Sequence, residues 1–427
     1  MPSLILSINA GSSSVKVSVY KSTSQSSAPT ELATVQVAGL TAPPATLTYD
    51  RGDEHVKNRE IEDINSQEDA FRYILDHLTN DEGLSELKQK DDIEFACHRI
   101  VHGGDYEKAT KIDKDTYNHL EELSDLAPLH NAGALTIVRA VHSQLPKATN
   151  IAFFDTSFHS TIPAHIRTYA IDPTTATRNK LRKYGFHGLS YSSITRAVAA
   201  HLDKPQSSLN IIALHLGSGA SACCIRAGRS LDTSMGLTPL SGLPGATRSG
   251  DVDPSLIFHF THDAGRLSPA SSKQMHITAA EDILNKQSGW RALAGTTDFG
   301  AISARAEEGG DDAAAAKLAF DLFCDRILGF VGSYYVKLGG RVDALVFAGG
   351  IGEKGGLLRR RVAAGLACLG FELDAARNEN LPLARTVDVG REGARYRILV
   401  CRTDEQEEMA RGCVEVGEEL RGARVEL

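Results

Sequence analysis

Near the start of the chain stands the stretch Leu4-Ile5-Leu6-Ser7-Ile8-Asn9-Ala10-Gly11-Ser12-Ser13-Ser14-Val15-Lys16-Val17-Ser18-Val19. Two runs with strand composition flank a short turn rich in glycine and serine, which predicts a β-hairpin. Small residues let the backbone approach a ligand, hydroxyl and N–H groups donate hydrogen bonds, and Lys16 adds positive charge, so the turn suits a phosphate group. A polar surface turn with a solvated lysine fits this hairpin equally well. Because the turn joins two strands, it is not a P-loop, whose turn leads into a helix.

The same pattern occurs a second time, about half a chain later. Residues 210–225 read Asn-Ile-Ile-Ala-Leu-His-Leu-Gly-Ser-Gly-Ala-Ser-Ala-Cys-Cys-Ile. In an alignment of the two stretches, His215-Leu216-Gly217-Ser218 corresponds to Asn9-Ala10-Gly11-Ser12. A repeated hairpin indicates a duplicated domain. We expect a cleft between the two copies, with each turn facing one end of a polyphosphate.

Composition places the chain among ordinary globular proteins with two domains. Its 427 residues are too many for one hydrophobic core. Hydrophobic residues make up 42% and charged residues 23%, and the net charge is -8. Nucleic acids and membrane surfaces are themselves anionic, so we expect neither as a partner, and an anionic small substrate requires a local basic pocket.

The cysteines and the apolar runs predict a cytoplasmic location. The seven cysteines are odd in number and form no Cys-x-x-Cys pair, which favours reduced, buried thiols. We expect no signal peptide, because the first residues lack a basic region and their apolar run is short. No apolar run approaches the roughly 18–20 residues of a membrane span.

Periodicity predicts the larger elements outside the two hairpins. Antiparallel strands are expected over residues 21–60. Helices are expected over residues 66–80, 114–124, 132–144 and 311–338. The last of these has Leu318, Leu322 and Val331 among its apolar positions.

The C-terminal third carries a second glycine-rich stretch. A buried strand over 342–348 should lead into the loop Gly349-Gly350-Ile351-Gly352-Glu353-Lys354-Gly355-Gly356 and then a helix over 357–369. Strand, glycine loop and helix together are typical of nucleotide binding, although a glycine loop alone is weak evidence.

Charged side chains follow several predicted strands, which is where α/β proteins build their sites. Arg99 stands at the end of one strand, before a double glycine, and either belongs to a site or pairs with a surface carboxylate. Asp155 follows the strand over 151–154 and either holds Mg²⁺ through water or caps the next element. Glu405 begins the acidic run after the last strand and is either a second magnesium-side carboxylate or an ordinary helix start.

Three residues in predicted turns and loops are further candidates. His130 follows an X-Pro turn and either caps the helix over 132–144 or lines the cleft. His187 is flanked by glycines, which favours close approach of a ligand, although a lone histidine is more often a packed one. Arg248 lies among small residues in the long loop over 235–254, as a guanidinium that reaches a phosphoryl group requires.

Taken together, these segments resemble the acetate kinase family, of the acetate and sugar kinase/Hsp70/actin superfamily. The matching stretches follow the family's order across nearly the whole chain: 9–16, 98–104, 127–131, 154–159, 184–188, 215–221, 244–254 and 347–353. The resemblance implies an α/β fold of duplicated actin/Hsp70/sugar-kinase-like (ribonuclease H-like) domains with an interdomain cleft. The N-terminal domain would cover residues 1–154 and be completed by the helix over 405–427. The domain over 155–404 would bind nucleotide and dimerise. The Ser/Thr-rich insertion near the N-terminus and the tail resemble the fungal branch.

The resemblance also implies an activity. A cytoplasmic homodimer would transfer the γ-phosphoryl of ATP to acetate, reversibly and with Mg²⁺, giving acetyl phosphate and ADP by direct in-line transfer. A carboxylate is already a nucleophile, so such a reaction requires charge neutralisation and positioning of two anions rather than a strong base. The residues that would be catalytic are Arg99, His187, Arg248, Asp155 and His130.

The resemblance assigns the remaining site residues to three groups. Those that would bind the substrate are Arg99, Val101, Leu129, Phe186 and Pro239. Those that would position Mg²⁺ are Asn9, Asp155 and Glu405. Those that would bind phosphate or nucleotide are Asn9, Ser12, Ser14, Lys16, His215, Gly217, Ser218, Gly219, Asp298, Phe299, Gly349, Gly350, Ile351, Gly352 and Lys354.

The chain departs from the family pattern at the nucleotide end. Ser218 and Lys354 each stand where the family usually has asparagine, and Gly300 stands where bacterial relatives have arginine. Another nucleotide, or pyrophosphate, therefore stays open as the donor. A propionate or butyrate kinase is the alternative among enzymes. A non-enzymatic nucleotide switch of the actin/Hsp70 kind is the other alternative, although a switch does not require two arginines and a histidine.

Overall fold

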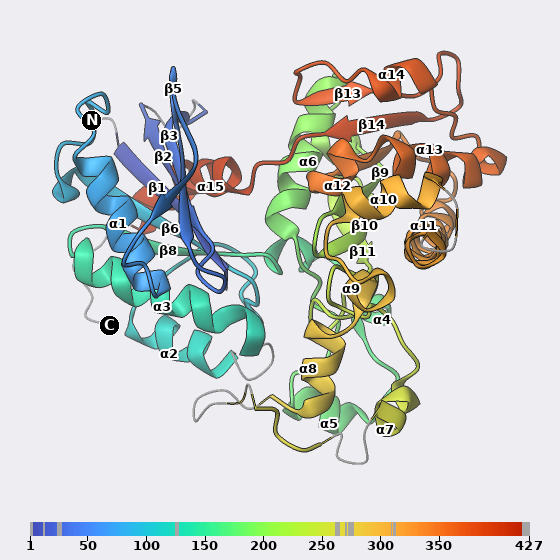
Figure 1. Cartoon of the computed structure of the whole chain (residues 1–427), viewed down its shortest axis with the longest axis horizontal. Helices are drawn as coiled ribbons and strands as arrows, with labels where there is room; N and C mark the ends of the chain where they lie inside the picture. The colour runs from blue at the N-terminus through green and yellow to red at the C-terminus, as the bar shows by residue number, and fades with distance from the viewer. Residues whose placement is uncertain are drawn as a thin grey trace. The chain divides into compact units, whose positions relative to one another are not determined.

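The computed structural model describes residues 3–11, 13–23, 28–123, 128–260, 265–269, 271, 277–308, 310 and 313–420, and of residues 128–130, 132 and 418 only the backbone. The chain forms two compact units, Met1–Ser157 with Asp404–Leu427 and Phe158–Thr403 (Figure 1). Ser12 and the side chains of Leu129 and His130, all predicted site residues, lie outside the described part.

An eight-stranded sheet forms the centre of the first unit, in the order β5-β4-β3-β2-β1-β6-β8-β7. Its first five strands pair antiparallel in succession, whereas β1, β6 and β8 run parallel. The strands are β1 (Ser3–Ala10), β2 (Ser14–Ser22), β3 (Thr30–Ala38), β4 (Ala45–Arg51), β5 (Glu54–Ile61), β6 (Ile93–Ile100), β7 (Thr110–Lys111) and β8 (Thr149–Phe154). The helices are α1 (Gln67–Thr79), α2 (Lys114–Leu123), α3 (Pro128–Gln144) and α15 (Glu405–Leu420).

The side chains of β1 alternate between two packed faces of this sheet. Leu6 and Ile8 join one hydrophobic core with Phe71 of α1. Ser7 points to the other face, where its hydroxyl donates to the backbone oxygen of Gln406 at 2.9 Å. The period of two therefore places α1 and α15 on opposite faces, although α15 comes from the far end of the chain (Figure 1).

The second unit repeats this plan on a six-stranded sheet in the order β11-β10-β9-β12-β14-β13. The strands are β9 (Ile211–Leu216), β10 (Ala220–Arg226), β11 (Arg229–Thr233), β12 (Ala344–Ala348), β13 (Thr386–Asp388) and β14 (Arg397–Cys401). The helices are α4 (Ala164–Arg167), α5 (Pro173–Arg178), α6 (Gly188–His201), α7 (Ile257–Phe260), α8 (Ala279–Lys286), α9 (Gly289–Ala294), α10 (Phe299–Glu308), α11 (Ala313–Lys337), α12 (Gly349–Lys354), α13 (Gly356–Gly365) and α14 (Ala375–Glu379).

The order of strands shows that the domain is duplicated. Both units contain the same strand order, β3-β2-β1-β6-β8 in the first and β11-β10-β9-β12-β14 in the second. In each, three strands pair antiparallel, and the last two strands run parallel to β1 or to β9. The side chains of β9 also alternate between two hydrophobic cores, since Ala213 packs in the core with α6 and Leu214 packs in the core with α11. Both predicted hairpins are confirmed, as β1–β2 and as β9–β10. The prediction of a duplicated α/β fold is thereby confirmed.

One helix begins earlier than predicted, and the buried face of another can now be assigned. The helix expected over 132–144 begins at Pro128, so the backbone of His130 lies in its first turn rather than at its cap. Proline suits this first position because it has no N–H group to leave unpaired. Of the apolar positions named for α11, Val331 is buried, Leu318 is 58% exposed and Leu322 is half-buried. The buried stripe instead runs through Phe320, Phe323 and Ile327, with Val331 one helical turn further on.

The glycine loop after β12 is also more regular than predicted. Residues 349–354 form the short helix α12, and α13 begins one residue early, at Gly356, and ends at Gly365. The guanidinium of Arg359 stabilises the end of α12, because its Nη1 donates to the backbone oxygens of Gly352 and Glu353 at 2.7 and 2.8 Å. A buried arginine therefore satisfies the carbonyl groups that a helix C-terminus leaves unpaired.

All seven cysteines are free thiols, and six of them are buried, as predicted; Cys368 is the exposed one. Among the helices that the structure describes, none has the length and apolar character needed to cross a membrane.

Two buried histidines should make the fold sensitive to acid. Burial lowers the pKa of His98 to about 4, and it lowers the pKa of His159 to about 4 as well. In the unfolded chain the pKa of histidine is about 6.5, so the contribution of each neutral ring to the free energy of unfolding is fully present above pH 6.5. As the pH falls from 6.5 toward 4, the free energy of unfolding decreases by up to about 1.4 kcal/mol per pH unit for each histidine. Urea unfolding at pH 7, 6 and 5 measures this loss. His98→Gln should reduce the loss between pH 6 and 5, whereas the exposed His201→Gln should leave it unchanged. Equal losses in His98→Gln and the unaltered chain would contradict the assignment.

Candidate active site

Four predicted site residues of the first unit meet at one edge of its sheet. Asn9 lies near the end of β1, Arg99 near the end of β6, and Asp155 directly after β8. Because these three strands run parallel, their carboxyl ends share an edge. Glu405, the first residue of α15, reaches the same place from the far end of the chain.

Arg99 is the centre of this group. Its Nη2 lies 2.7 Å from Oδ2 of Asp155, and its Nη1 lies 2.8 Å from Oε2 of Glu405. Asn9 completes the group, because its Oδ1 accepts from Nη1 of Arg99 at 3.4 Å and its Nδ2 donates to Glu405 at 3.2 Å. The side chains of Asp155, Glu405 and Arg99 are only 1%, 14% and 17% exposed. We call these four residues the Arg99 cluster.

The charges in the Arg99 cluster support one another. Burial by itself would lower the pKa of Arg99, but the charges of Asp155 and Glu405 outweigh it and hold the pKa above its usual range. The simpler interpretation of Arg99, a partner for a surface carboxylate, is wrong, because the carboxylates it contacts are largely buried.

The oxygen atoms of the Arg99 cluster fit a magnesium ion. Two carboxylates and one amide oxygen are hard ligands of the kind that Mg²⁺ prefers. Among the described residues, no group of three or more His, Cys, Asp or Glu side chains is placed so that it could hold a metal ion.

Three other predicted residues of the first unit lie near Asn9 or Arg99. Lys16 of β2 pairs with Asn9 across the hairpin and is half-buried, and Ser14 begins the same strand. Val101 follows β6, two residues beyond Arg99, and is half-buried.

His187 stands at the start of α6 in the second unit. It caps the helix in a left-handed backbone conformation, with φ of 60°, and is 9% exposed. Its Nδ1 lies 2.8 Å from Oγ of Ser221, which in turn lies 2.5 Å from the hydroxyl of Tyr191. The ring stacks on His215 at 4.3 Å between centroids, and Nδ1 of His215 lies 2.7 Å from Oγ of Ser190. Both imidazoles are therefore held by hydroxyl groups and by each other.

Arg248 lies against the turn of the second hairpin. A Cβ atom on Gly219 would lie 3.2 Å from both Nη1 and Nη2 of Arg248, so this glycine leaves room for the guanidinium. Nη1 of Arg248 donates to the backbone oxygen of Pro239 at 3.2 Å. The backbone N–H of Ala246 donates to the oxygen of Ser218 at 2.8 Å, which ties the loop to the hairpin. The structure thus brings together Arg248, Pro239 and the Gly217–Gly219 turn.

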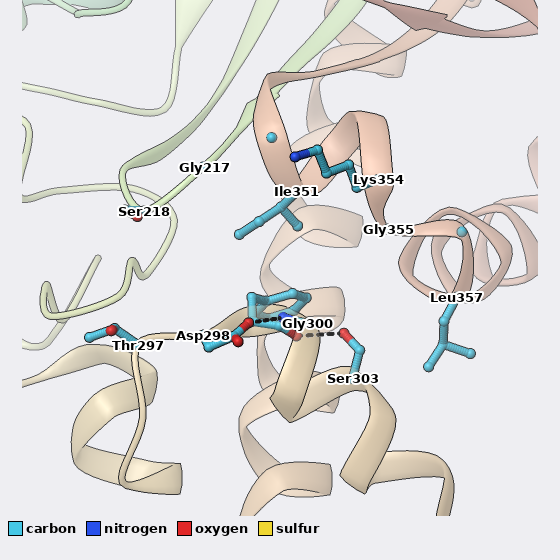
Figure 2. A pocket seen from close by; sticks show the side chains of 13 residues that line it. Gly217, Ser218, Thr297, Asp298, Gly300, Ser303, Ile351, Lys354, Gly355 and Leu357 are labelled. Atoms are coloured by element: carbon cyan, nitrogen blue, oxygen red, sulfur yellow. Dashed lines mark hydrogen bonds between the residues drawn. The ribbon is translucent and has the colours of Figure 1, made fainter. Parts of the chain in front are cut away.

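A pocket of about 530 Å³ begins at this turn and extends between α10 and α12 (Figure 2). Seven predicted residues line it: Gly217, Ser218, Asp298, Phe299, Gly350, Ile351 and Lys354. Figure 2 shows Ser218 at one end, Leu357 at the other, and Ile351 pointing into the space above Asp298 and Gly300. His215, Gly219, Gly349 and Gly352 were predicted for the same role but are not among the lining residues.

Phe299 lines the pocket, whereas Gly349 and Glu353 are sequence neighbours of the lining residues Gly350 and Lys354. Phe299 is only 5% exposed, and its ring packs against Trp290 and Phe323 in the core. Gly349 has φ of 75°, and a Cβ atom there would lie 2.7 Å from the backbone oxygen of Leu216, so only glycine fits. The carboxylate of Glu353 accepts from the backbone N–H groups of Thr403 and Gly349, and burial raises its pKa.

Sequence reasoning missed several lining residues: Thr297, Ser303, Gly355, Gly356 and Leu357. Ser303 lies one helical turn after Phe299 on α10, so helical spacing from a predicted site residue would have found it. Nothing in the sequence indicates the contribution of Arg359, whose carbonyl partners become visible only once α12 is folded.

Comparison with known proteins places the chain in one family. The model of the acetokinase family matches residues 4–411. A probable acetate kinase of Chaetomium globosum is 55% identical, with 98% of this chain and 99% of the relative covered, and one of Neurospora crassa is 53% identical, with 98% and 95% covered. Solved structures agree: Porphyromonas gingivalis acetate kinase (TM-score 0.80, 31% identity) and a propionate kinase of Francisella tularensis (TM-score 0.82, 32% identity) each cover 96% of this chain and 98% of their own. The resemblance in the sequence motifs, including that to fungal proteins, is confirmed, and the chain belongs to the acetokinase family.

Proposed function

We propose that the chain catalyses reversible, Mg²⁺-dependent transfer of the γ-phosphoryl of ATP to acetate, giving acetyl phosphate and ADP. The names of the fungal relatives support acetate as the acceptor. The observation that carries the proposal is the pocket of about 530 Å³ that begins at the Gly217–Ser218 turn, in the unit that also holds His187 and Arg248. This volume is within the range of small-molecule sites.

The second unit would hold the nucleotide. Gly217 and Ser218 lie at one end of the pocket and would contact phosphate, while Asp298, Ile351 and Lys354 also line the pocket and would hold the nucleoside. Arg248, beside the same turn, would neutralise charge on the phosphoryl group in transfer. His187, oriented by Ser221, would donate a hydrogen bond to the same group.

The first unit would hold the acceptor and the metal. Arg99 supplies a rigid fork of donors that matches a carboxylate. Asp155, Glu405 and the amide oxygen of Asn9 would hold Mg²⁺, which when bound neutralises charge on the donor phosphates. By the family resemblance, Val101 and Leu129 of this unit, and Phe186 and Pro239 of the second unit, would form the methyl pocket. Ser12, Ser14 and Lys16 would contact phosphate, and His130 would be a further catalytic residue.

The acetate carboxylate needs no base to become a nucleophile. The side chains therefore have two tasks, to bring two anions into line and to balance their charge. We further propose that the protein is a cytoplasmic homodimer with the dimer contacts in the second unit. The buried free thiols support the location, and the family resemblance supports the dimer.

A hydroxamate assay tests the proposal directly. The purified chain with acetate, ATP and Mg²⁺ should form acetyl phosphate, and EDTA should abolish the product. Propionate and butyrate should react progressively less well, because the side chains proposed for the methyl pocket include bulky Leu129 and Phe186. Replacing ATP by pyrophosphate should give no product. Product with pyrophosphate alone would overturn the donor, faster reaction with butyrate would overturn the acceptor, and no product with any pair would overturn the function.

A further inference from the structure

A histidine outside the proposed reaction holds the loop that carries Phe186 and His187. His159 is 2% exposed, and both of its ring nitrogens have partners. Its Nε2 lies 2.9 Å from the backbone oxygen of Phe186, and its Nδ1 lies 2.8 Å from Oγ of Ser230 on β11. A carbonyl oxygen only accepts, so Nε2 carries the proton and donates to Phe186. Nδ1 is then the acceptor, and the hydroxyl of Ser230 donates to it.

The ring of His159 also packs directly on the backbone of this loop. Gly185 has φ of 81°, and a Cβ atom there would lie 2.7 Å from Cδ2 of His159 and 2.5 Å from Cγ2 of Thr233. Two residues later His187 is again left-handed, with φ of 60°, which is uncommon for a residue other than glycine. Such a conformation persists only where the surrounding structure holds it.

Other contacts hold the beginning of the loop, and Ser221 and His215 contact the side chain of His187 at its end. Nζ of Lys183 lies 2.8 Å from Oδ1 of Asp232 and 3.0 Å from the backbone oxygen of Thr233. The backbone N–H groups of Tyr184 and Gly185 both donate to the oxygen of Gly236. The bond from His159 comes after these, at the residue directly before His187.

The surroundings keep His159 neutral. Burial lowers its pKa to about 4, against a smaller opposing effect of the bond to Phe186 and the charge of Asp232, while Lys183 lowers the pKa further. The rings of Phe158 and Tyr191 contact it edge-on, with centroids at 5.6 and 5.7 Å. A neutral imidazole has one donor and one acceptor, which is what Phe186 and Ser230 require.

We propose that His159 is a positioning residue: held as the Nε2–H tautomer by Ser230, it fixes the Phe186 carbonyl and so sets the direction in which Phe186 and His187 point. This inference rests on the proposed function, in which those two residues contact the reacting groups. His159 itself touches neither substrate nor nucleotide in this account.

Steady-state kinetics with a matched control test the role. His159→Phe keeps an aromatic ring but removes both hydrogen bonds, and it should lower kcat/KM for acetate by about 10-fold to 100-fold, as a small misplacement of reacting groups does. The affinity for ADP should stay near that of the unaltered chain, because the pocket lies elsewhere in the unit. His159→Gln keeps a donor for Phe186 and should recover most of the loss. Tyr396→Phe is the control, because it removes a 2.7 Å bond to the backbone oxygen of Gly340 in the same unit. It should leave kcat/KM unchanged.

The tautomer provides a readout that does not depend on activity or on the Phe variant folding. With ¹⁵N-labelled histidine, the imidazole signal that is missing from His159→Gln should show the Nε2–H tautomer down to about pH 5, and Ser230→Ala should weaken its preference. The Nδ1–H tautomer at His159, a fall in ADP affinity as large as the fall in kcat/KM, or unchanged kinetics in a folded His159→Phe chain would each overturn the inference. If the unaltered chain makes no acetyl phosphate, the proposed function fails, while the tautomer still tests the geometry at His159.

Discussion

Arg99→Ala should lower kcat for acetyl phosphate formation by about a thousandfold or more, the scale seen when an arginine that stabilises a transferred phosphoryl group is removed. Arg99 is the only cation among the four members of the Arg99 cluster, and it contacts both carboxylates. Its loss would remove the proposed partner of the acetate carboxylate and leave Asp155 and Glu405 repelling each other at the proposed metal site. The hydroxamate assay measures the first effect.

The same variant should unfold more easily. Removing one partner of a largely buried ion pair costs on the order of 3 kcal/mol, because the remaining charge is left without compensation. Arg139→Ala provides the matched control, since its 2.7 Å pair with Glu121 joins side chains that are 64% and 53% exposed in the same unit. That change should cost less than about 1 kcal/mol and leave kcat unaltered. Near-normal turnover in Arg99→Ala would remove Arg99 from the catalytic machinery.

Arg248→Ala should lower kcat to a similar degree while the fold stays intact. The guanidinium comes from a loop without regular structure, donates to the Pro239 carbonyl and lies against Gly219 rather than in the core. Arg248 does not line the pocket proposed for the nucleotide, so the affinity for ADP should change by less than about threefold. The variant should mainly lower kcat, as expected for an interaction made in the transition state. Arg248→Lys should recover little, because one ammonium does not reproduce the fork of a guanidinium.

A second arginine in the same unit provides the control for Arg248. Nη1 of Arg377 also donates to a backbone oxygen, that of Gly390 at 3.3 Å, but Arg377 lies outside the pocket lining. Arg377→Ala should leave both kcat and ADP affinity unchanged. Equal losses in the two alanine variants would show that the effect of Arg248→Ala is structural, and a parallel fall in ADP affinity would place Arg248 on the nucleotide instead.

Much of the site follows from short-range patterns in the sequence. The turns at Gly11 and Gly217 predict their hairpins because turn chemistry and strand alternation depend on residues only a few positions apart. Recurrence of that pattern predicts the duplication, which the two strand orders confirm. The glycine stretch after β12 likewise indicated the residues that line the pocket, although its backbone forms a short helix rather than a loop.

The contacts that join distant segments of the chain follow only from the tertiary structure. Arg99, Asp155 and Glu405 are recognisable as candidates from the sequence. Their contact with one another depends on parallel strands and on a helix from the far end of the chain that packs against β1. His159 and Arg359 act on backbone carbonyl groups, which every residue carries and no pattern marks. Local propensity depends on side chains that are neighbours in the sequence. These contacts, in contrast, form only after the buried faces of the sheets have packed and brought distant segments together.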